Sequence, residues 1–398
     1  MIYAKRSPAT HTFHSLAMSS LTTMCVTLLT ALPSLGAHNE SEEFECGRWG
    51  DFITVPVTIG DTELQFLLDT GSEITVVDQT MQHLLIPTES KKKLSDGYKS
   101  VSVKTFKLPS QTRIGKSVPI GDVPFVLAHD FRRPRDAFGV EFDGILGCDS
   151  LQDKCVQIDF DKGVVRFLNS VDRGDTGLGA EVPLGRNKKG SPTIPMRIGA
   201  GRPIPFVIDT GAIAVSIQID NPLYLSLEKR GNLETVGESE IMRANGNTVE
   251  RKGQLESARL GPYRPRNVKI GTGPFPFVGL DFLSRFMVTL DLRNDRAFLL
   301  PGSRISRGPD RNVTGAEFSR VRGKFFIHQV EDGSIAAQAG LKPRDQVSRV
   351  NGIATSHISS ISMRRNMSLA NGALKLTVHR ANTPLDVTIP VRTEQRQD

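Results

Sequence analysis

Apolar and polar residues alternate in several short segments, and the same series of segments appears twice along the chain. Residues 55–60 and 194–199 alternate and end at a glycine, and each is followed by an apolar run, at 66–68 and 206–208. Alternation with period two, bounded by Gly, is typical of half-buried strands, whereas a short apolar run is typical of a fully buried strand. The pattern predicts a mainly β protein built from hairpins.

These segments belong to a larger duplication. Phe66–Ser72 aligns with Phe206–Ala212 at an offset of 140 positions. Two other pairs match at an offset of 132, namely 144–147 with 276–279 and 156–160 with 288–292. The shared order predicts two homologous β lobes, at 44–170 and 180–300, joined by a polar segment.

Each lobe carries Asp-Thr-Gly directly after its buried strand, with the aspartates at Asp69 and Asp209. An aspartate in this position is held rigidly, and the glycine two residues later lets the backbone turn sharply against a neighbouring group. A single buried carboxylate is costly, whereas two that meet across a pseudo-twofold axis can share one proton. The duplicated motif therefore predicts that Asp69 and Asp209 face each other in one site.

Asp-Thr-Gly followed by an apolar-apolar-Gly block resembles the pepsin and retropepsin aspartic proteases across about residues 50–300. The resemblance implies two tandem retropepsin-like lobes that form a pepsin-like bilobal β fold within one chain. It also implies an aspartic endopeptidase in which one carboxylate of Asp69 and Asp209 is ionised and activates water, while the other is protonated and polarises the scissile carbonyl. The residues implied for the two active-site turns are Thr70, Gly71, Ser72, Thr210, Gly211 and Ala212.

The two turns differ at their fourth residue. The Ser72 hydroxyl can donate a hydrogen bond toward Asp69, whereas the Ala212 side chain offers nothing comparable to Asp209. We therefore expect Asp69 to ionise more readily and to act as the base. The resemblance further implies that Thr70 and Thr210 brace the two turns against each other.

Polar segments between the motifs of each lobe are the candidates for flaps that cover a bound substrate. Met242–Glu250 contains Ala-Asn-Gly-Asn and predicts a hairpin tip in the second lobe. The counterpart in the first lobe is about Tyr98–Phe106.

The pattern changes after a linker at 301–317 that is rich in Arg and Gly. The segments 333–341 and 345–352 resemble PDZ domains, which implies a small α+β domain at 318–393 with a helix at 358–369. In that family a peptide adds as a strand beside the helix, with its terminal carboxylate held by backbone N–H groups. The residues in the expected carboxylate-loop position, and hence the predicted peptide-binding residues, are Gly323, Lys324, Phe325 and Phe326. The alternative is a purely structural domain.

The first 37 residues predict a signal peptide, because Lys5 and Arg6 precede an uncharged stretch at 15–37 that ends in small residues. We expect an exported protein, periplasmic or secreted. If the segment is not cleaved, it instead anchors the protein in a membrane, and a membrane is a partner only in that case.

Removal of the signal peptide leaves Cys46, Cys148 and Cys155. At most one disulfide can form within the chain, from Cys46 to Cys148 or Cys155, and the alternative is that all three are small buried hydrophobic residues. No histidine has the spacing of a zinc ligand relative to them, so the sequence predicts neither a metal site nor a cofactor.

The formal charge of +7 raises the question of a nucleic-acid partner, but the basic residues are scattered and are not interleaved with aromatic residues. We therefore expect polypeptide substrates, with a C-terminal peptide as a further ligand of the PDZ domain and no nucleic acid. Two alternatives stay open: an inactive peptide-binding scaffold that retains both modules, and a protease that requires a homodimer. Asp69 and Asp209 in one chain argue against obligatory dimerisation.

Overall fold

A computed structural model describes residues 40–391 apart from 48–50, 96–99, 173, 214, 244–245, 307–313 and 370–371. The predicted signal peptide lies outside these residues. Residues 38–398 form one compact unit. Strands predominate and helices are few and short, which confirms the mainly β fold class.

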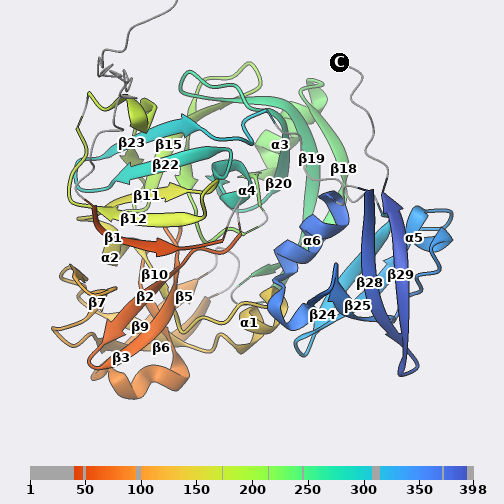
Figure 1. Cartoon of the computed structure of the whole chain (residues 1–398). Coiled ribbons are helices and arrows are strands. Elements are labelled where there is room, and N and C mark those ends of the chain that lie inside the picture. Colours follow the sequence, from red (N-terminus) through yellow and green to blue (C-terminus); the bar gives the residue numbers. More distant parts are fainter. Residues whose placement is uncertain are drawn as a thin grey trace, which may run out of the picture. The chain divides into compact units, whose positions relative to one another are not determined.

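An antiparallel sheet of six strands joins the two halves of the chain (Figure 1). Its strands, in spatial order, are β1 (Glu40–Glu45), β12 (Val164–Leu168), β11 (Cys155–Asp159), β22 (Phe286–Asp291), β23 (Arg296–Pro301) and β13 (Ala180–Pro183). The central strands β11 and β22 are equivalent in the sequence repeat. Gln157 lies opposite Thr289, and its Nε2 donates to Thr289 Oγ1 at 3.1 Å. The pseudo-twofold axis of the duplication therefore passes between these two strands.

The first lobe contains a sheet of nine described strands, and the second a sheet of eight. In spatial order the first is β5 (Ile86–Ser95), β6 (Ser100–Lys107), β9 (Val126–His129), β4 (Val76–Asp78), β10 (Gly144–Leu146), β3 (Thr62–Leu68), β2 (Thr54–Ile59), β7 (Arg113–Ile114) and β8 (Val118–Pro119). The second is β14 (Gly185–Arg186), β15 (Pro192–Ile198), β16 (Ile204–Ile208), β21 (Phe277–Val278), β17 (Ile217–Ile219), β20 (Arg266–Thr272), β19 (Gly246–Leu260) and β18 (Leu233–Arg243).

The duplication is visible in the strand order of these two sheets. The run β9-β4-β10-β3-β2 in the first lobe corresponds to β20-β17-β21-β16-β15 in the second. In both runs the strand before the Asp-Thr-Gly turn pairs in parallel with the strand of the apolar-apolar-Gly block. The sequence repeat therefore encodes a repeated local frame for each aspartate.

The two lobes contain short helices, of which one pair is equivalent in the sequence repeat and the others are not. The lobe helices are α1 (Arg132–Phe138), α2 (Cys148–Leu151), α3 (Asn221–Lys229) and α4 (Leu280–Leu283), with 3-10 turns η1 (Gln79–Leu84) and η2 (Thr176–Leu178). The helices α2 and α4 follow the equivalent glycines of the repeat, Gly147 and Gly279. By contrast, α1 and α3 stand at different points of the repeat. The lobes thus agree near the aspartates and diverge farther out.

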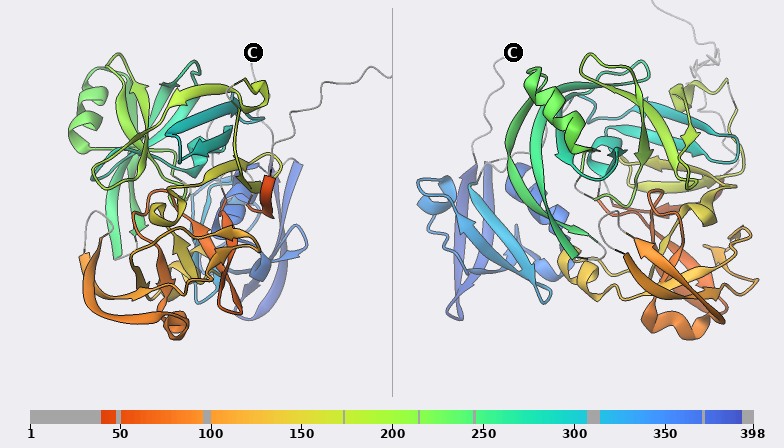
Figure 2. Two further views of the ribbon diagram at one scale, coloured as in Figure 1. Left: turned by 90° about the vertical axis from the view of Figure 1, so that its left-hand side faces the viewer. Right: turned by 180° about the vertical axis from the view of Figure 1, so that it is seen from behind.

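A long hairpin projects from each lobe sheet. In the second lobe, β18 and β19 stay paired as far as Arg243 and Gly246, and both views of Figure 2 show this hairpin in green. The strands of the predicted hairpin around Met242–Glu250 are therefore present, although residues 244–245 lie outside the described residues. In the first lobe β5 and β6 stay paired as far as Ser95 and Ser100, and the expected counterpart lies mainly in the second of these strands.

The C-terminal domain is a separate sheet packed against a helix. Its elements are β24 (Ala316–Val321), β25 (Lys324–Val330), α5 (Ile335–Gln338), β26 (Gln346–Val350), β27 (Ile353–Ala354), η3 (Thr355–His357), α6 (Ser360–Leu369), β28 (Gly372–Arg380) and β29 (Thr383–Val391). The first strand begins at Ala316, two residues before the predicted domain start. Met363 and Met367 of α6 pack into an apolar core that is distinct from the core of the lobes.

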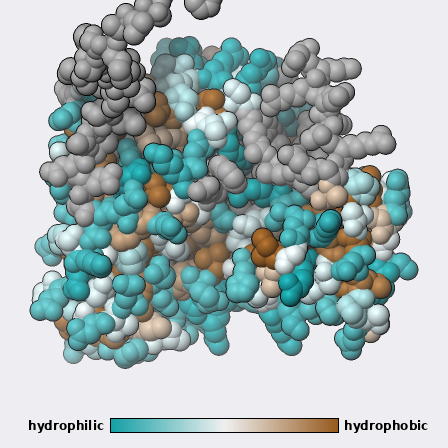
Figure 3. Space-filling view, in the orientation of Figure 1, coloured by the Kyte–Doolittle hydropathy of each residue, from teal (hydrophilic) through white to brown (hydrophobic). Residues whose placement is uncertain are grey.

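Apolar residues are concentrated in these cores rather than on the surface. The largest fully buried side chains in the described chain are mostly phenylalanines of the two lobes. On the face drawn in Figure 3, hydrophilic residues predominate and apolar residues form scattered patches. Burial of this apolar surface supplies the main driving force for the fold.

Candidate active site

The two predicted catalytic aspartates occupy equivalent positions at strand ends. Asp69 follows β3, and its N–H donates to Leu146 O of the parallel strand β10 at 3.0 Å. Asp209 follows β16, and its N–H donates to Val278 O of β21 at 2.9 Å. Each aspartate is therefore fixed by a backbone hydrogen bond to its own apolar-apolar-Gly block.

Thr70 and Thr210 hold the two turns together through reciprocal hydrogen bonds. Thr70 Oγ1 donates to Ile208 O at 2.6 Å, and Thr210 Oγ1 donates to Leu68 O at 2.7 Å. Each hydroxyl also accepts from the opposite backbone, since Thr70 N donates to Thr210 Oγ1 and Thr210 N donates to Thr70 Oγ1. Both threonines are buried. The brace that the resemblance implied is thus present, and it joins the end of one lobe's strand to the turn of the other.

Gly71 and Gly211 each lie directly against the carboxyl group of the opposite lobe. A Cβ added at Gly71 would stand 2.4 Å from Asp209 Cγ, and one added at Gly211 would stand 2.3 Å from Asp69 Cγ. No side chain fits at such a distance, so glycine is required at both positions. The same proximity shows that the structure brings Asp69 and Asp209 together.

Asp69 lies in a dense set of hydrogen bonds. Its Oδ1 accepts from Gly71 N and Ser72 N, both at 2.9 Å, and its carboxyl group is hydrogen-bonded to Asp209. Burial raises the pKa of Asp69, and the Ser72 and Gly71 N–H donors only partly oppose that rise. Asp209 accepts from Gly211 N at 3.0 Å. The pair therefore has the environment of two carboxyl groups that share a proton.

The hydroxyl of Ser72 does not point at Asp69. Ser72 Oγ donates to Ile74 O at 2.8 Å, and only the Ser72 backbone N–H bonds to Asp69. We expected Asp69 to be the base because Ser72 has a hydroxyl and Ala212 has none. Since the Ser72 hydroxyl does not bond to Asp69, this reason no longer holds. The donor to Asp69 is the backbone N–H of Ser72, and not its side chain.

Thr75 and Asp149 support the first turn, and the sequence analysis did not single them out. Asp149 accepts from Thr75 N at 3.0 Å and from Thr75 Oγ1 at 2.7 Å. Thr75 Oγ1 in turn accepts from Gly147 N at 3.0 Å. Burial raises the pKa of Asp149, and the bonds from Thr75 and Ser150 work against that rise. Position 149 aligns with Asp281 in the repeat, and this match was the available signal.

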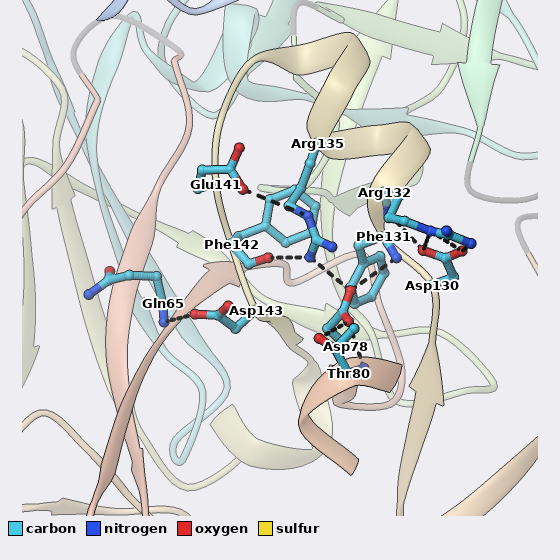
Figure 4. A network of polar contacts seen from close by, with 10 residues as sticks. All are labelled: Gln65, Asp78, Thr80, Asp130, Phe131, Arg132, Arg135, Glu141, Phe142 and Asp143. Carbon is cyan, nitrogen blue, oxygen red and sulfur yellow. Dashed lines mark hydrogen bonds and ion pairs between the residues drawn. The ribbon is translucent and has the colours of Figure 1, made fainter. Parts of the chain in front are cut away.

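A second network stands behind the cleft wall of the first lobe (Figure 4). Asp78, at the end of β4, accepts from Thr80 N at 2.8 Å, from Phe131 N at 3.2 Å and from Arg135 NH1 at 2.7 Å. Arg135 NH1 also donates to Phe142 O at 3.0 Å. Burial alone would raise the pKa of Asp78, but the hydrogen bonds from Thr80, Phe131 and Arg135 outweigh it and lower the pKa. The buried carboxylate of Asp78 thus holds Phe131 directly and Phe142 through Arg135.

The aspartates open into a cavity of about 2060 Å³. Its lining combines charged residues with apolar residues from both lobes. The first lobe contributes Leu67, Val76, Leu94, Phe131, Phe142 and Ile145, and the second contributes Val207, Ile213, Ile217, Ile270, Phe275 and Phe277. Residues of the β18–β19 hairpin line it as well, so this hairpin has the position expected of a flap.

The three cysteines in the described chain are free thiols. Cys148 and Cys155 are buried, and Cys148 Sγ donates to Thr70 O at 2.8 Å, next to the threonine brace. Cys46 is half-buried, and burial raises its pKa to about 12. This arrangement agrees with the alternative of small buried residues rather than with a disulfide.

The predicted PDZ carboxylate loop has a different structure from the one expected. Arg322 and Gly323 form the two-residue turn between β24 and β25, with φ values of 50° and 73°. β25 is paired with β24 on one edge and with β26 on the other. Phe325 is fully buried, while Lys324 and Phe326 belong to the same interior strand. A peptide therefore cannot add to β25, because the end strands of this sheet in the described chain are β24 and β29.

No group of three or more His, Cys, Asp or Glu side chains in the described part is arranged to hold a metal ion. Within the same residues, no helix has the length and apolar character needed to cross a bilayer.

Comparison with protein families supports both parts of the architecture. Residues 55–150 match a family model described as aspartyl protease, and residues 326–364 match one described as PDZ domain. The chain thus carries an aspartyl protease domain and a PDZ domain. The protease match covers the first lobe only. A search of curated proteins finds no match.

Proposed function

We propose that this chain is an aspartic endopeptidase, in which Asp69 and Asp209 activate a water molecule that hydrolyses peptide bonds. The observation that carries the proposal is the contact of each turn glycine with the opposite lobe's carboxyl group. It means that one chain supplies both halves of a carboxyl pair, so that a homodimer is not needed to build the site. The aspartyl protease domain supports hydrolysis of peptides in general.

The chemistry needs one ionised and one protonated carboxyl group. The ionised group removes a proton from water, and the water oxygen bonds to the scissile carbonyl carbon while the protonated group donates to the carbonyl oxygen. The C–N bond then breaks as the carboxyl group that took the proton from water donates it to the amine nitrogen. A hydroxyl of the tetrahedral diol gives its proton to the other carboxylate, so that the pair again holds one proton. The raised pKa of Asp69, caused by burial, supports a pair in which one member holds a proton.

Conversion of either aspartate to asparagine tests the proposal. Asp69→Asn and Asp209→Asn should each reduce casein cleavage on the order of 10³-fold or more, because neither asparagine can share the proton. Asp122→Asn, at an exposed position outside the cavity, is the matched control. Cleavage retained by either active-site variant would refute the shared pair. Peptide binding without cleavage by the unaltered protein would instead indicate an inactive scaffold.

Export is the second part of the proposal, and it rests on the charge and composition of residues 1–37. The mature protein should then begin near His38 and be recovered from the periplasm or the medium. Edman sequencing or mass spectrometry of the recovered N-terminus measures this directly. A full-length protein that sediments with membranes would support the anchored alternative.

A further inference from the structure

The cavity that contains the aspartates is larger than a typical site for a small molecule. Ligand pockets typically occupy roughly 300–1,000 Å³, whereas this cavity has a volume of about 2060 Å³. Its lining does not end at the two lobes. It includes β24 of the PDZ domain at 316–319, and Arg364, Arg365 and Met367 of α6. The catalytic cleft and the groove between β24 and α6 therefore form one continuous space.

The PDZ side of this space has the properties of a strand-binding groove. β24 is an end strand of its sheet, and such a strand offers backbone groups with which an extended peptide can pair. Phe318 and Met367 belong to the apolar cluster of the domain, so the floor of the groove is apolar. A peptide here would be held mainly through its backbone, and the groove would accept many sequences.

Contacts with the first lobe hold the PDZ domain in this orientation. Asp136 of α1 accepts hydrogen bonds from Arg322 N at 3.1 Å and from Gly323 N at 2.6 Å, at the β24–β25 turn. Asp51 accepts from the hydroxyls of Ser359 and Ser362 at the start of α6. Both edges of the groove are thus tied to the lobe that carries Asp69.

The second lobe meets the same groove through its flap. Lys252 on β19 lines the cavity, and its pKa is lowered by burial and by the nearby charges of Arg364 and Lys269. Arg364 belongs to α6, so the flap and the PDZ helix share one electrostatic environment. Both aspartates, Lys252 and Arg364 line the same cavity, so a polypeptide bound at the carboxyl pair has room to reach the groove.

We propose that β24 and α6 form an extended substrate subsite, in which a second stretch of the polypeptide being cleaved binds as a strand beside β24. The inference rests on the proposed protease function. In this proposal the ligand of the PDZ groove is the substrate chain itself, and not the free C-terminus of another protein. Recruitment and cleavage then act on one continuous polypeptide, and the distance from the pair to β24 selects substrates that are long enough.

Substrates of two lengths test this assignment. A casein cleavage site identified by mass spectrometry is made as a short peptide that fills only the cleft and as a longer one extended on either side. Ser319→Trp fills the groove from β24, and Arg364→Trp fills it from α6. Lys375→Trp, at an exposed PDZ position outside the cavity, is the matched control.

We expect each groove variant to lower kcat/KM for the long peptide about tenfold more than for the short peptide, the effect of about 1.4 kcal/mol of lost binding. The control should behave as the unaltered protein does. Equal losses for both peptides, or no loss for either, would overturn the subsite. If the unaltered protein cleaves neither peptide, the proposed function fails and the subsite fails with it. Calorimetry identifies a variant whose PDZ domain does not fold, and the variant on the other wall then decides.

Discussion

The two lobes are nearly identical where they meet and clearly different one layer behind. Around the carboxyl pair, each lobe supplies one aspartate, one bracing threonine and one glycine in mirrored contacts. Behind that layer, Thr75 and Asp149 of the first lobe are fully hydrogen-bonded, whereas Ser216 Oγ and Asp281 Oδ2 of the second are buried without a hydrogen-bond partner in the described chain. The hydrogen-bond pattern of the two lobes is therefore symmetric around the carboxyl pair and differs one layer behind it.

The strand-end aspartates show the same divergence. Asp78 of the first lobe is paired with Arg135 inside the wall of the cleft. Its counterpart in the second lobe, Asp220, caps the helix α3 by accepting from Leu223 N at 2.8 Å. One residue type at one repeat position thus holds an ion pair in one lobe and a helix terminus in the other. This difference accompanies a family-model match that covers the first lobe alone.

Substitution of the turn glycines tests the symmetric layer and should have the largest effect. Gly71→Ala and Gly211→Ala should each reduce proteolysis on the order of 10²–10³-fold, because the new methyl group displaces the opposite carboxyl group. The two losses should be similar in size. Steady-state cleavage of casein measures them.

The control for this experiment is Gly201→Ala, where an added Cβ meets nothing closer than 3.8 Å. Activity of that variant should match the unaltered protein. A large loss at one turn glycine and a small loss at the other would show that the catalytic layer is not symmetric.

The symmetric layer is also the part that the sequence could predict. Asp69 and Asp209 stand in matching apolar contexts, and a close-packed dyad leaves little freedom in the residues around it. The hydroxyl direction of Ser72 could not be predicted, because it depends on a local turn that brings Ile74 O within reach. The ion pair of Asp78 and Arg135 joins residues far apart in sequence, and no periodic pattern indicates such a contact.

The PDZ domain shows a different limit. Its strands and helix follow from the resemblance and from periodicity, but Arg322–Phe326 forms a hairpin turn and the start of an interior strand in place of the expected loop. The turn at Arg322 and Gly323 requires positive φ at both residues, which Gly tolerates and Arg rarely adopts. A Gly preceded by Arg gave no clear signal of a two-residue hairpin turn.

Substitution of the strand-end aspartates tests the layer in which the lobes differ. Asp78→Asn should lower the free energy of unfolding by about 3 kcal/mol at pH 7, since it leaves the largely buried Arg135 without its nearest anion. Asp220→Asn should change it by less than about 0.5 kcal/mol, because Asn caps a helix as well as Asp does. Calorimetry of the protease lobes measures both.

The pH dependence of the first variant sharpens the contrast. The pKa of Asp78 is lowered in the folded state, so its contribution is present above the unfolded value of about 3.9 and is lost as the pH falls through the folded pKa. The stability gap between the unaltered protein and Asp78→Asn should therefore shrink below about pH 4. A gap that stays constant from pH 7 to pH 3 would show that Asp78 acts through packing and not through its charge.

The smallest expected difference is in stability, between variants of the two hydroxyl residues behind the turns, Thr75 and Ser216. Thr75→Val should destabilise the protein by about 2 kcal/mol, because Asp149 loses a donor and Gly147 N–H loses its acceptor in a buried site. Ser216→Ala should change stability by less than about 0.5 kcal/mol or raise it slightly, since its buried hydroxyl makes no hydrogen bond in the described chain. Midpoints of thermal unfolding should differ by about 4–8 °C between the two variants. Equal midpoints would mean that Ser216 has a partner after all, and that the second lobe is as well satisfied as the first.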